Sequence, residues 1–180
     1  MNSVREEILS ACPPSYPASF RARVARAPHA VAYRVPQHQE PEVWKDLTWS
    51  QVADEVDQIA AGFIALGVQP EQRVAIAAMT RIEWVLADLG IACAAAATTT
   101  VYPNSQPDDE LFILQDSESV IVVAENWKQL QKVVDQSELN AQVHHIVLFD
   151  DDRPIDRADA GGDRVVTWDA LHALGRDYLA

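Results

Sequence analysis

The protein has 180 residues, 48% of them hydrophobic, and 27 acidic residues against 14 basic ones give it a formal net charge of −13. This length provides one domain, or one large and one small lobe, with enough apolar residues for a sizeable core. The charge excludes nucleic acid as a partner because no basic patch can neutralise phosphates. It also disfavours an anionic membrane surface, so we expect at most a peripheral membrane association.

Cysteine usage and the N-terminus point to a cytoplasmic protein. Cys12 and Cys93 are the only two cysteines, and they lie far apart in the sequence. Cys93 sits in an Ala-rich run, where a cysteine serves as a small buried hydrophobe, which fits a reducing compartment. The first 15 residues lack the apolar core of a secretory signal, and the apolar run 85–97 is too short to span a bilayer.

The N-terminal third predicts a lead-in, a helix and a hairpin. Residues 1–18 are rich in proline and are expected to be a lead-in. Ser19 is predicted to begin a short helix that ends before Pro28. Two short apolar segments separated by a polar loop, Val31–Val35 and Val43–Leu47, predict a β-hairpin.

A longer helix is predicted to follow the hairpin. Thr48 and Gln51 have the spacing of a capping box, and Gly67 is placed to end the helix. Apolar residues recur between these signals with the helical period. They are Val52, Val56, Ile59, Ala60 and Phe63.

Residues 19–150 are predicted to form an α/β lobe. Three helices separate four short apolar strands: a long one at Glu83–Ala97, one beginning at Pro107, and one carrying Trp127. Short buried strands that alternate with helices predict a parallel sheet of at least four strands with helices on both faces, preceded by the small β-hairpin. The predicted strands are Val74–Ala78, Thr98–Val101, Val120–Ala124 and His145–Phe149.

The chain changes character after Phe149. Residues 151–164 are charged and aperiodic, which predicts an acidic surface loop. Residues 165–180 then predict a short strand, Val165–Thr167, and a last helix that Thr167 caps. The helix is expected to turn four side chains inward: Trp168, Leu171, Leu174 and Tyr178.

The sequence contains no self-contained active site. Of the six glycines only Gly161 and Gly162 are adjacent, so no Gly-rich phosphate loop follows a strand. The three lysines, at positions 45, 128 and 132, do not adjoin a Ser/Thr/Gly cluster. Two cysteines cannot build a Cys-based zinc site, and the adjacent His144 and His145 would point to opposite faces of a strand. We therefore predict no catalytic residue and no metal ligand.

An acidic run, Asp150–Asp152, follows a predicted parallel strand. Ligands bind at the carboxyl edge of open α/β sheets, and a magnesium site would use carboxylates there. The alternative, which the neighbouring charges and the lack of a Gly-rich partner favour, is a solvated acidic loop.

Several segments occur in an order and spacing that resemble the fatty acyl-CoA synthetases of the adenylate-forming superfamily. The resemblance covers about residues 19–150 and continues weakly to 180. Arg73–Ile76 is similar to the family's Asp-Arg-Val-Ala-Ile strand, and Thr98–Ser105 is similar to its Pro-Leu/Ile-Tyr-Pro-Thr-Ser segment. Further similar segments are Phe20–Pro28, Thr48–Trp49, Gly67–Val68, Glu83–Trp84, Ile113–Leu114 and Asp116–Ser117.

A few residues depart from the family pattern. Glu71 and Gln72 stand where Gly-Asp is common, Ala95–Ala96 replace Ala-Gly, and Glu118 replaces a common glycine. Thr80 stands where asparagine is usual. A surface turn or a helix face can accommodate each change, so the resemblance holds.

The resemblance implies an enzyme that joins a long-chain fatty acid, ATP and coenzyme A through an acyl-adenylate, with Mg²⁺ as cofactor. The family's phosphate loop, magnesium-binding Thr-Glu, ribose-binding Asp and catalytic Lys do not occur in these 180 residues. We therefore expect an N-terminal piece of such a ligase, inactive by itself, whose main partner is the remainder of the synthetase chain. The alternative is a stand-alone, non-catalytic α/β binding or scaffold module, and the reading frame after Ala180 would discriminate between the two.

Two local expectations follow from the resemblance. Tyr102, Pro103 and Asn104 form the turn that would line the approach of coenzyme A, although Pro103 and Asn104 also suit an ordinary turn. Leu171, Leu174 and Tyr178 of the last helix would face the remainder of the enzyme, so the 180-residue chain is expected to expose them and to self-associate.

Overall fold

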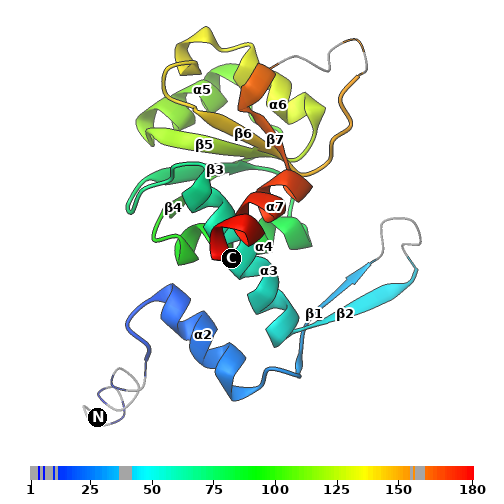
Figure 1. The fold of residues 1–180 in the computed structure, drawn as a ribbon. Coiled ribbons are helices and arrows are strands. Elements are labelled where there is room, and N and C mark those ends of the chain that lie inside the picture. The colour runs from blue at the N-terminus through cyan, green and yellow to red at the C-terminus, as the bar shows by residue number, and fades with distance from the viewer. Residues whose placement is uncertain are drawn as a thin grey trace. The chain divides into compact units, whose positions relative to one another are not determined.

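A computed structural model describes residues 4, 6, 10, 12–36, 42–154, 156 and 161–180. The chain divides into two compact units, Met1–Asp54 and Glu55–Ala180, each with its own internal contacts. Figure 1 shows the elements of both units coloured in chain order. Within the described ranges, no helix is long and apolar enough to cross a membrane.

The first helix, α2 (Tyr16–Arg26), begins earlier than predicted. The hydroxyl of Ser15 accepts a hydrogen bond from the backbone N–H of Ala18 at 3.3 Å. Ser15 is therefore the N-cap in place of Ser19, and Pro17 lies in the first turn, where its missing N–H costs nothing.

The predicted hairpin is confirmed. Strands β1 (Val31–Pro36) and β2 (Trp44–Thr48) pair antiparallel, and the cross-strand partners Arg34 and Asp46 form an exposed ion pair at 2.6 Å. The connecting residues 37–41 lie outside the described residues, as does most of the lead-in before Cys12.

An aromatic cluster organises the first unit around Trp49. The rings of Phe20 and Tyr33 lie 6.4 and 6.1 Å from the Trp49 ring. The guanidinium of Arg23 lies 4.9 Å over the same ring, where the π face attracts a cation.

Helix α3 (Trp49–Ala65) has both predicted ends. The N–H of Thr48 donates to Gln51 Oε1 at 2.9 Å, and the N–H of Gln51 donates to Thr48 Oγ1 at 3.3 Å, which completes the capping box. At the other end Gly67 has a φ of 91°, and the N–H of Val68 donates to the carbonyl of Phe63, as in a Schellman motif. The predicted apolar stripe is buried: Val52, Val56, Ile59, Ala60 and Phe63.

The second unit is built on a five-stranded parallel sheet in the order β4-β3-β5-β6-β7. The predicted fold class is confirmed, and the hairpin forms a separate sheet. The strands are β3 (Arg73–Ala77), β4 (Ala97–Val101), β5 (Ser119–Ala124), β6 (His145–Leu148) and β7 (Val165–Thr167).

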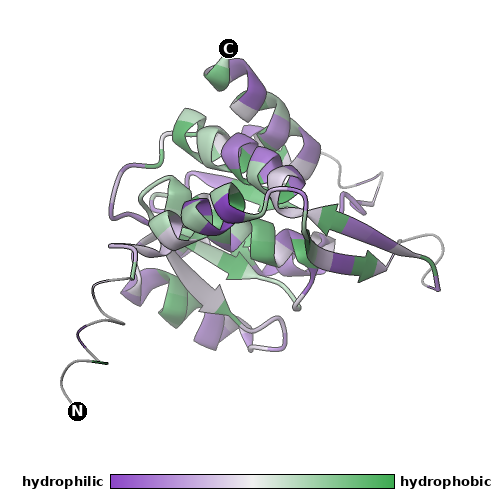
Figure 2. Ribbon diagram, turned by 90° about the horizontal axis from the view of Figure 1, so that it is seen from below, coloured by the Kyte–Doolittle hydropathy of each residue, from purple (hydrophilic) through white to green (hydrophobic). Residues whose placement is uncertain are grey.

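Helices cover both faces of this sheet (Figure 1). Helices α5 (Pro107–Asp116) and α6 (Trp127–Val134) lie on one face, together with the 3₁₀ turn Ser137–Leu139. Helices α4 (Ile82–Cys93) and α7 (Trp168–Leu179) lie on the other. Hydrophilic and hydrophobic residues alternate along the helices in Figure 2, as expected for helices that bury one side.

Helix α4 ends four residues before the predicted Ala97, because the chain must turn into β4. Its last turn forms a Schellman motif in which the N–H of Ala96 donates to the carbonyl of Ile91 and Ala95 adopts a φ of 59°. Glu71 and Glu118 also have positive φ, at 66° and 50°. The departures from the family's glycines at 71 and 118 therefore coincide with left-handed backbone positions, which glycine occupies without strain. At Ala95–Ala96 the left-handed residue is Ala95, one position before the family's glycine.

The last helix corrects one prediction. Leu171 is fully buried, whereas Leu174 and Tyr178 are 37% and 59% exposed. Leu171 lies so close to Gly62 of α3 that a Cβ at position 62 would meet its carbonyl oxygen at 2.4 Å. The expectation that four side chains of this helix turn inward is therefore wrong for Leu174 and Tyr178. The expectation that the helix exposes Leu171, Leu174 and Tyr178 is wrong for Leu171, so only Leu174 and Tyr178 remain for the self-association that we predict.

Candidate functional site at the carboxyl edge of the sheet

All five strands of the sheet end at the same level. Ala77 at the end of β3 pairs with Val101 of β4 and with Ala124 of β5. Leu148 at the end of β6 pairs with Ala124 and with Thr167 of β7. The segments that follow the strands therefore leave the sheet together at one carboxyl edge, which is where open α/β sheets bind ligands.

The turn after β4 carries the three predicted site residues at this edge. The N–H of Ser105 donates to the carbonyl of Tyr102 at 2.9 Å, with Pro103 and Asn104 at the centre of the turn. The Tyr102 side chain is 75% exposed. The predicted position and the predicted exposed ring are confirmed, whereas the role of the turn in binding stays a prediction.

Two side chains of α6 contact the turn from the protein interior. Lys132 Nζ donates to the carbonyl oxygens of Pro103 at 2.8 Å and Ser105 at 3.0 Å. Gln129 Nε2 donates to the Pro103 carbonyl at 3.0 Å. In the sequence, Lys132 is only one of three lysines that do not adjoin a Ser/Thr/Gly cluster. No sequence pattern indicates that α6 lies under the turn after β4.

Arg81 joins two other segments of the same edge. Its Nη1 and Nη2 donate to the two carboxylate oxygens of Asp150 at 2.6 and 3.0 Å, and its Nε donates to Glu83 at 2.6 Å. The guanidinium also lies 5.6 Å over the Phe149 ring. Partial burial opposes the charge, but the bonds to Asp150 and Glu83 outweigh it and raise the pKa of Arg81.

The acidic run Asp150–Asp152 is engaged within the protein. Asp150 accepts from Arg81, Asp151 accepts from Arg153 at 2.7 Å, and Asp152 accepts from the backbone N–H of Trp127 at 2.7 Å. In the part of the chain that the structure describes, no three His, Cys, Asp or Glu side chains are grouped to hold a metal ion. These carboxylates therefore tie loops together at the carboxyl edge of the sheet.

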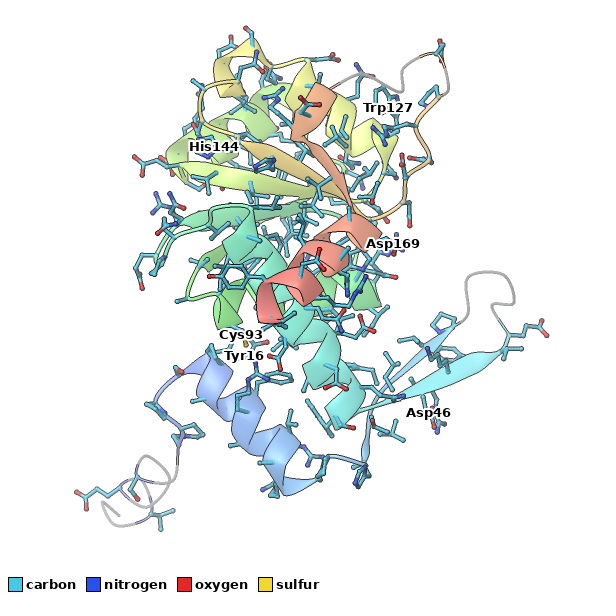
Figure 3. All side chains as sticks on the ribbon, in the orientation of Figure 1. Tyr16, Asp46, Cys93, Trp127, His144 and Asp169 are labelled. Atoms are coloured by element: carbon cyan, nitrogen blue, oxygen red, sulfur yellow. The ribbon has the colours of Figure 1, made fainter. Side chains whose placement is uncertain are left out.

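The adjacent histidines, which we predicted to point to opposite faces of a strand, lie at the start of β6. His144 precedes β6 and is exposed, and Figure 3 shows it at the opposite end of the sheet from Trp127, which begins α6. His145 is the first residue of β6, and partial burial, reinforced by neighbouring His144, lowers its pKa.

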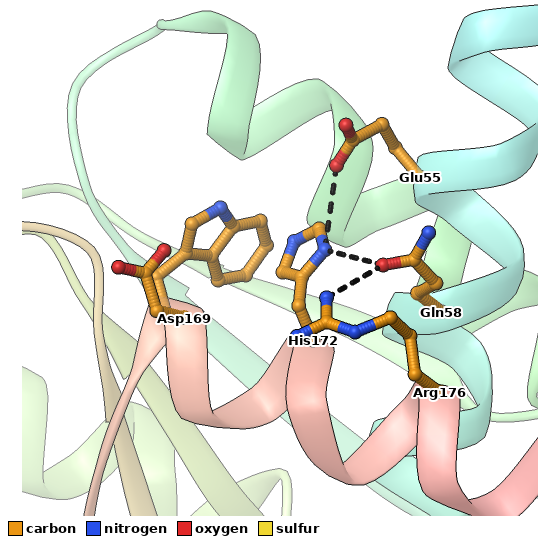
Figure 4. Close-up of a pocket in the computed structure, with 6 residues that line it drawn as sticks. Glu55, Gln58, Asp169, His172 and Arg176 are labelled. Atoms are coloured by element: carbon orange, nitrogen blue, oxygen red, sulfur yellow. Dashed lines mark hydrogen bonds and ion pairs between the residues drawn. The ribbon is translucent and has the colours of Figure 1, made fainter.

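A polar cavity of about 480 Å³, which no sequence pattern indicated, lies between α3 and α7. His172 Nδ1 lies 3.3 Å from both Glu55 Oε2 and Gln58 Oε1 (Figure 4). Arg176 donates to the same Gln58 oxygen at 3.1 Å. Trp168 contacts His172 edge-on at a centroid distance of 5.1 Å.

The cavity favours a neutral His172. Burial lowers the pKa of this imidazole most strongly, and Arg176 adds to that effect, while Glu55 and Asp169 oppose it. Nε2 is buried and makes no hydrogen bond with any described residue, which suits a neutral ring whose proton is on Nδ1. Because the polar groups of the cavity bind one another, we assign it a structural role in joining the two helices.

The sheet order and its carboxyl edge define an open α/β lobe, and comparison with known proteins identifies its family. Residues 20–172 match the family described as AMP-binding enzyme. The long-chain-fatty-acid–CoA ligase FadD15 of Mycobacterium bovis is 37% identical over 95 residues, which are 53% of this chain and 16% of that protein. The long-chain-fatty-acid–CoA ligase ACSBG2 of Xenopus laevis is 27% identical over 134 residues, which are 74% of this chain and 18% of that protein.

Solved structures show the same fold. The A domain of a carboxylic acid reductase from Segniliparus rugosus has a TM-score of 0.72 at 14% identity and matches 89% of this chain and 30% of that one. A long-chain-fatty-acid CoA ligase from Rhodopseudomonas palustris has a TM-score of 0.69 at 20% identity and matches 86% of this chain and 35% of that one.

The chain thus belongs to the AMP-binding enzyme family, the adenylate-forming enzymes that include the fatty acyl-CoA ligases, as its sequence predicted. It spans less than a fifth of the length of the two curated relatives.

Proposed function

We propose that these residues form the N-terminal lobe of an ATP-dependent long-chain fatty acyl-CoA synthetase and that the 180-residue chain by itself forms no acyl-adenylate. The observation that carries the proposal is the family match over residues 20–172 combined with a sequence that contains no phosphate loop. Adenylyl transfer depends on amides, lysine, arginine and magnesium that neutralise and position the phosphates. A chain with a net charge of −13, whose edge carboxylates are already engaged, does not supply that environment.

The test is fatty-acid-dependent release of pyrophosphate by the purified 180-residue chain with ATP and Mg²⁺. We expect no release above the rate without enzyme, while a complete synthetase that contains the same lobe releases pyrophosphate under the same conditions. Release by the 180-residue chain would overturn the proposal. We also propose that the enzyme acts in the cytoplasm, because a sequence with only two cysteines, far apart along the chain, is typical of a reducing compartment.

We further propose that Tyr102, Pro103 and Asn104 line the approach of coenzyme A to the adenylate. An aromatic ring that is 75% exposed contributes little to folding and is available to a ligand. In the complete synthetase, Tyr102→Ala should therefore slow thioester formation roughly ten-fold and leave adenylate formation nearly unchanged, because the two half-reactions use different parts of the site.

Phe112→Ala provides a matched control. Phe112 lies on α5 and is a similarly exposed aromatic residue, at 66%. Its removal should leave both half-reactions unchanged. Equal losses of both half-reactions in Tyr102→Ala would indicate misfolding, and no loss in either would assign the turn a purely structural role.

A further inference from the structure

We propose that Lys132 and Gln129 are positioning residues for the approach of coenzyme A: they hold the Tyr102–Ser105 turn in the conformation that presents the Tyr102 ring. This inference rests on the proposed role of the turn in the thioester-forming step. It adds that the turn is held from the interior by a buried polar cluster, defined here as Glu110, Gln129 and Lys132.

The Lys132 ammonium has two hydrogen-bond acceptors and one ion-pair partner. The acceptors are the carbonyl oxygens of Pro103 and Ser105, at 2.8 and 3.0 Å. The ion-pair partner is the carboxylate of Glu110, whose Oε2 lies 3.4 Å from Nζ. Lys132 therefore joins the turn to α5.

Gln129 donates a second hydrogen bond to the Pro103 carbonyl oxygen. It is 4% exposed, and its Nε2 donates to Pro103 at 3.0 Å. The Pro103 oxygen therefore accepts from both α6 side chains, which uses the two acceptor positions of a carbonyl oxygen. The backbone on either side of Asn104 is consequently held at more than one point.

Glu110 balances the charge of Lys132. It is 2% exposed, and neither of its oxygens accepts a hydrogen bond from any described residue. Burial raises the pKa of Glu110, and the charge of Lys132 counteracts that rise. The pairing keeps a lysine that is only 14% exposed from carrying an uncompensated charge.

Folding alone does not require this cluster. The turn already closes through the Ser105-to-Tyr102 hydrogen bond and contains residues with strong turn preference. A buried ion pair is weak evidence for stability, because taking two charges out of water offsets their attraction. A polar cluster that adds little stability but fixes the turn under an exposed aromatic ring is what ligand binding by the turn would require. A turn that is already ordered loses less conformational entropy when its ligand binds.

The experiment compares Lys132→Met with Lys128→Met, an exposed lysine on the same helix. Methionine keeps the length of the side chain and removes the charge and the donors. In the 180-residue chain, hydrogen exchange of the Ser105 amide should become roughly ten-fold faster in Lys132→Met and stay unchanged in Lys128→Met. Lys132→Met leaves the buried Glu110 carboxylate without its ion-pair partner, which can destabilise the chain. If it does, the double variant Lys132→Met/Glu110→Gln removes both charges and is measured in the same way.

The same variants in the complete synthetase give the functional result. Lys132→Met, or the double variant, should raise KM for coenzyme A roughly ten-fold and leave KM for ATP and the rate of adenylate formation unchanged. A purely structural role would change both half-reactions together, which would overturn the inference, as would an unchanged exchange rate at Ser105.

The outcomes also separate this inference from the role of the turn. If Tyr102→Ala slows thioester formation but Lys132→Met does not, the inference is wrong and the turn still lines the approach of coenzyme A. If exchange at Ser105 becomes faster and neither variant changes thioester formation, the proposed role of the turn is wrong, and the inference fails with it.

Discussion

Ala95 provides a direct test of the left-handed end of α4. It is an exposed residue with a φ of 59°, at the position of the Schellman motif that Gly67 occupies at the end of α3. A left-handed conformation costs a non-glycine residue about 1–2 kcal/mol. Ala95→Gly removes that cost, but it also makes the unfolded chain more flexible, which costs about 0.4–1 kcal/mol. The net expectation is a small gain in the free energy of unfolding.

Ala92→Gly is the matched control, because the same methyl group is removed three residues earlier, inside the helix. Glycine in a helix interior costs about 1 kcal/mol relative to alanine. That cost already includes the greater flexibility of the unfolded glycine variant, so it is compared with the net gain expected for Ala95→Gly. Ala95→Gly should therefore be more stable than Ala92→Gly by about 2 kcal/mol, since the two net effects have opposite signs.

Thermal unfolding of the two variants measures this difference. About 2 kcal/mol corresponds to a separation of the midpoints of about 4–8 °C for a chain of this size. Urea unfolding should give the same order of stability with an unchanged slope. Midpoints that coincide, or a lower midpoint for Ala95→Gly, would refute the argument that this position is strained.

Two further predictions concern ionisable groups of the described residues. Arg81→Gln leaves the Asp150 carboxylate without its two-pronged partner and should lower the free energy of unfolding by about 1–2 kcal/mol, an effect reduced because Asp150 is 44% exposed. Arg34→Gln removes one partner of the exposed ion pair of the hairpin and should leave the unfolding midpoint nearly unchanged. Similar losses of stability in Arg81→Gln and Arg34→Gln would contradict the view that only the partly buried ion pair stabilises the fold. Because the pKa of His172 is lower in the folded state, its stabilising contribution is complete above the unfolded-state value of 6.5 and is lost as the pH falls through the folded-state pKa. His172→Gln should therefore reduce the fall in the free energy of unfolding below about pH 6.5, as measured by urea unfolding at several pH values. The control His29→Gln, at an exposed histidine, should keep the original dependence of stability on pH. An unchanged pH dependence in His172→Gln would argue against this linkage.

Local signals in the sequence were sufficient for most of the elements. The capping box at Thr48, the glycine at position 67 and the apolar stripe of α3 act within one or two turns of the chain, so neighbouring residues determine them. The four short apolar strands between helices were sufficient for a parallel sheet, because such strands must be covered on both faces. Ser15 replaced Ser19 as the N-cap of α2, because several residues can cap a helix and only one does so.

The sequence also located the turn at Tyr102, because a turn after a parallel strand must lie at the carboxyl edge. It did not show that Leu171 is buried against α3, because the pattern of α7 defines an apolar face without defining what covers it.

Tertiary structure alone decided which distant side chains meet. Arg81 and Asp150 are 69 residues apart, and His172 and Gln58 are 114 apart. Lys132 reaches Pro103 across 29 residues because α6 packs beneath the turn after β4. No periodicity or local preference encodes such pairings: they depend on the order β4-β3-β5-β6-β7 and on the packing of each helix, which arise only when the whole chain buries its apolar surface.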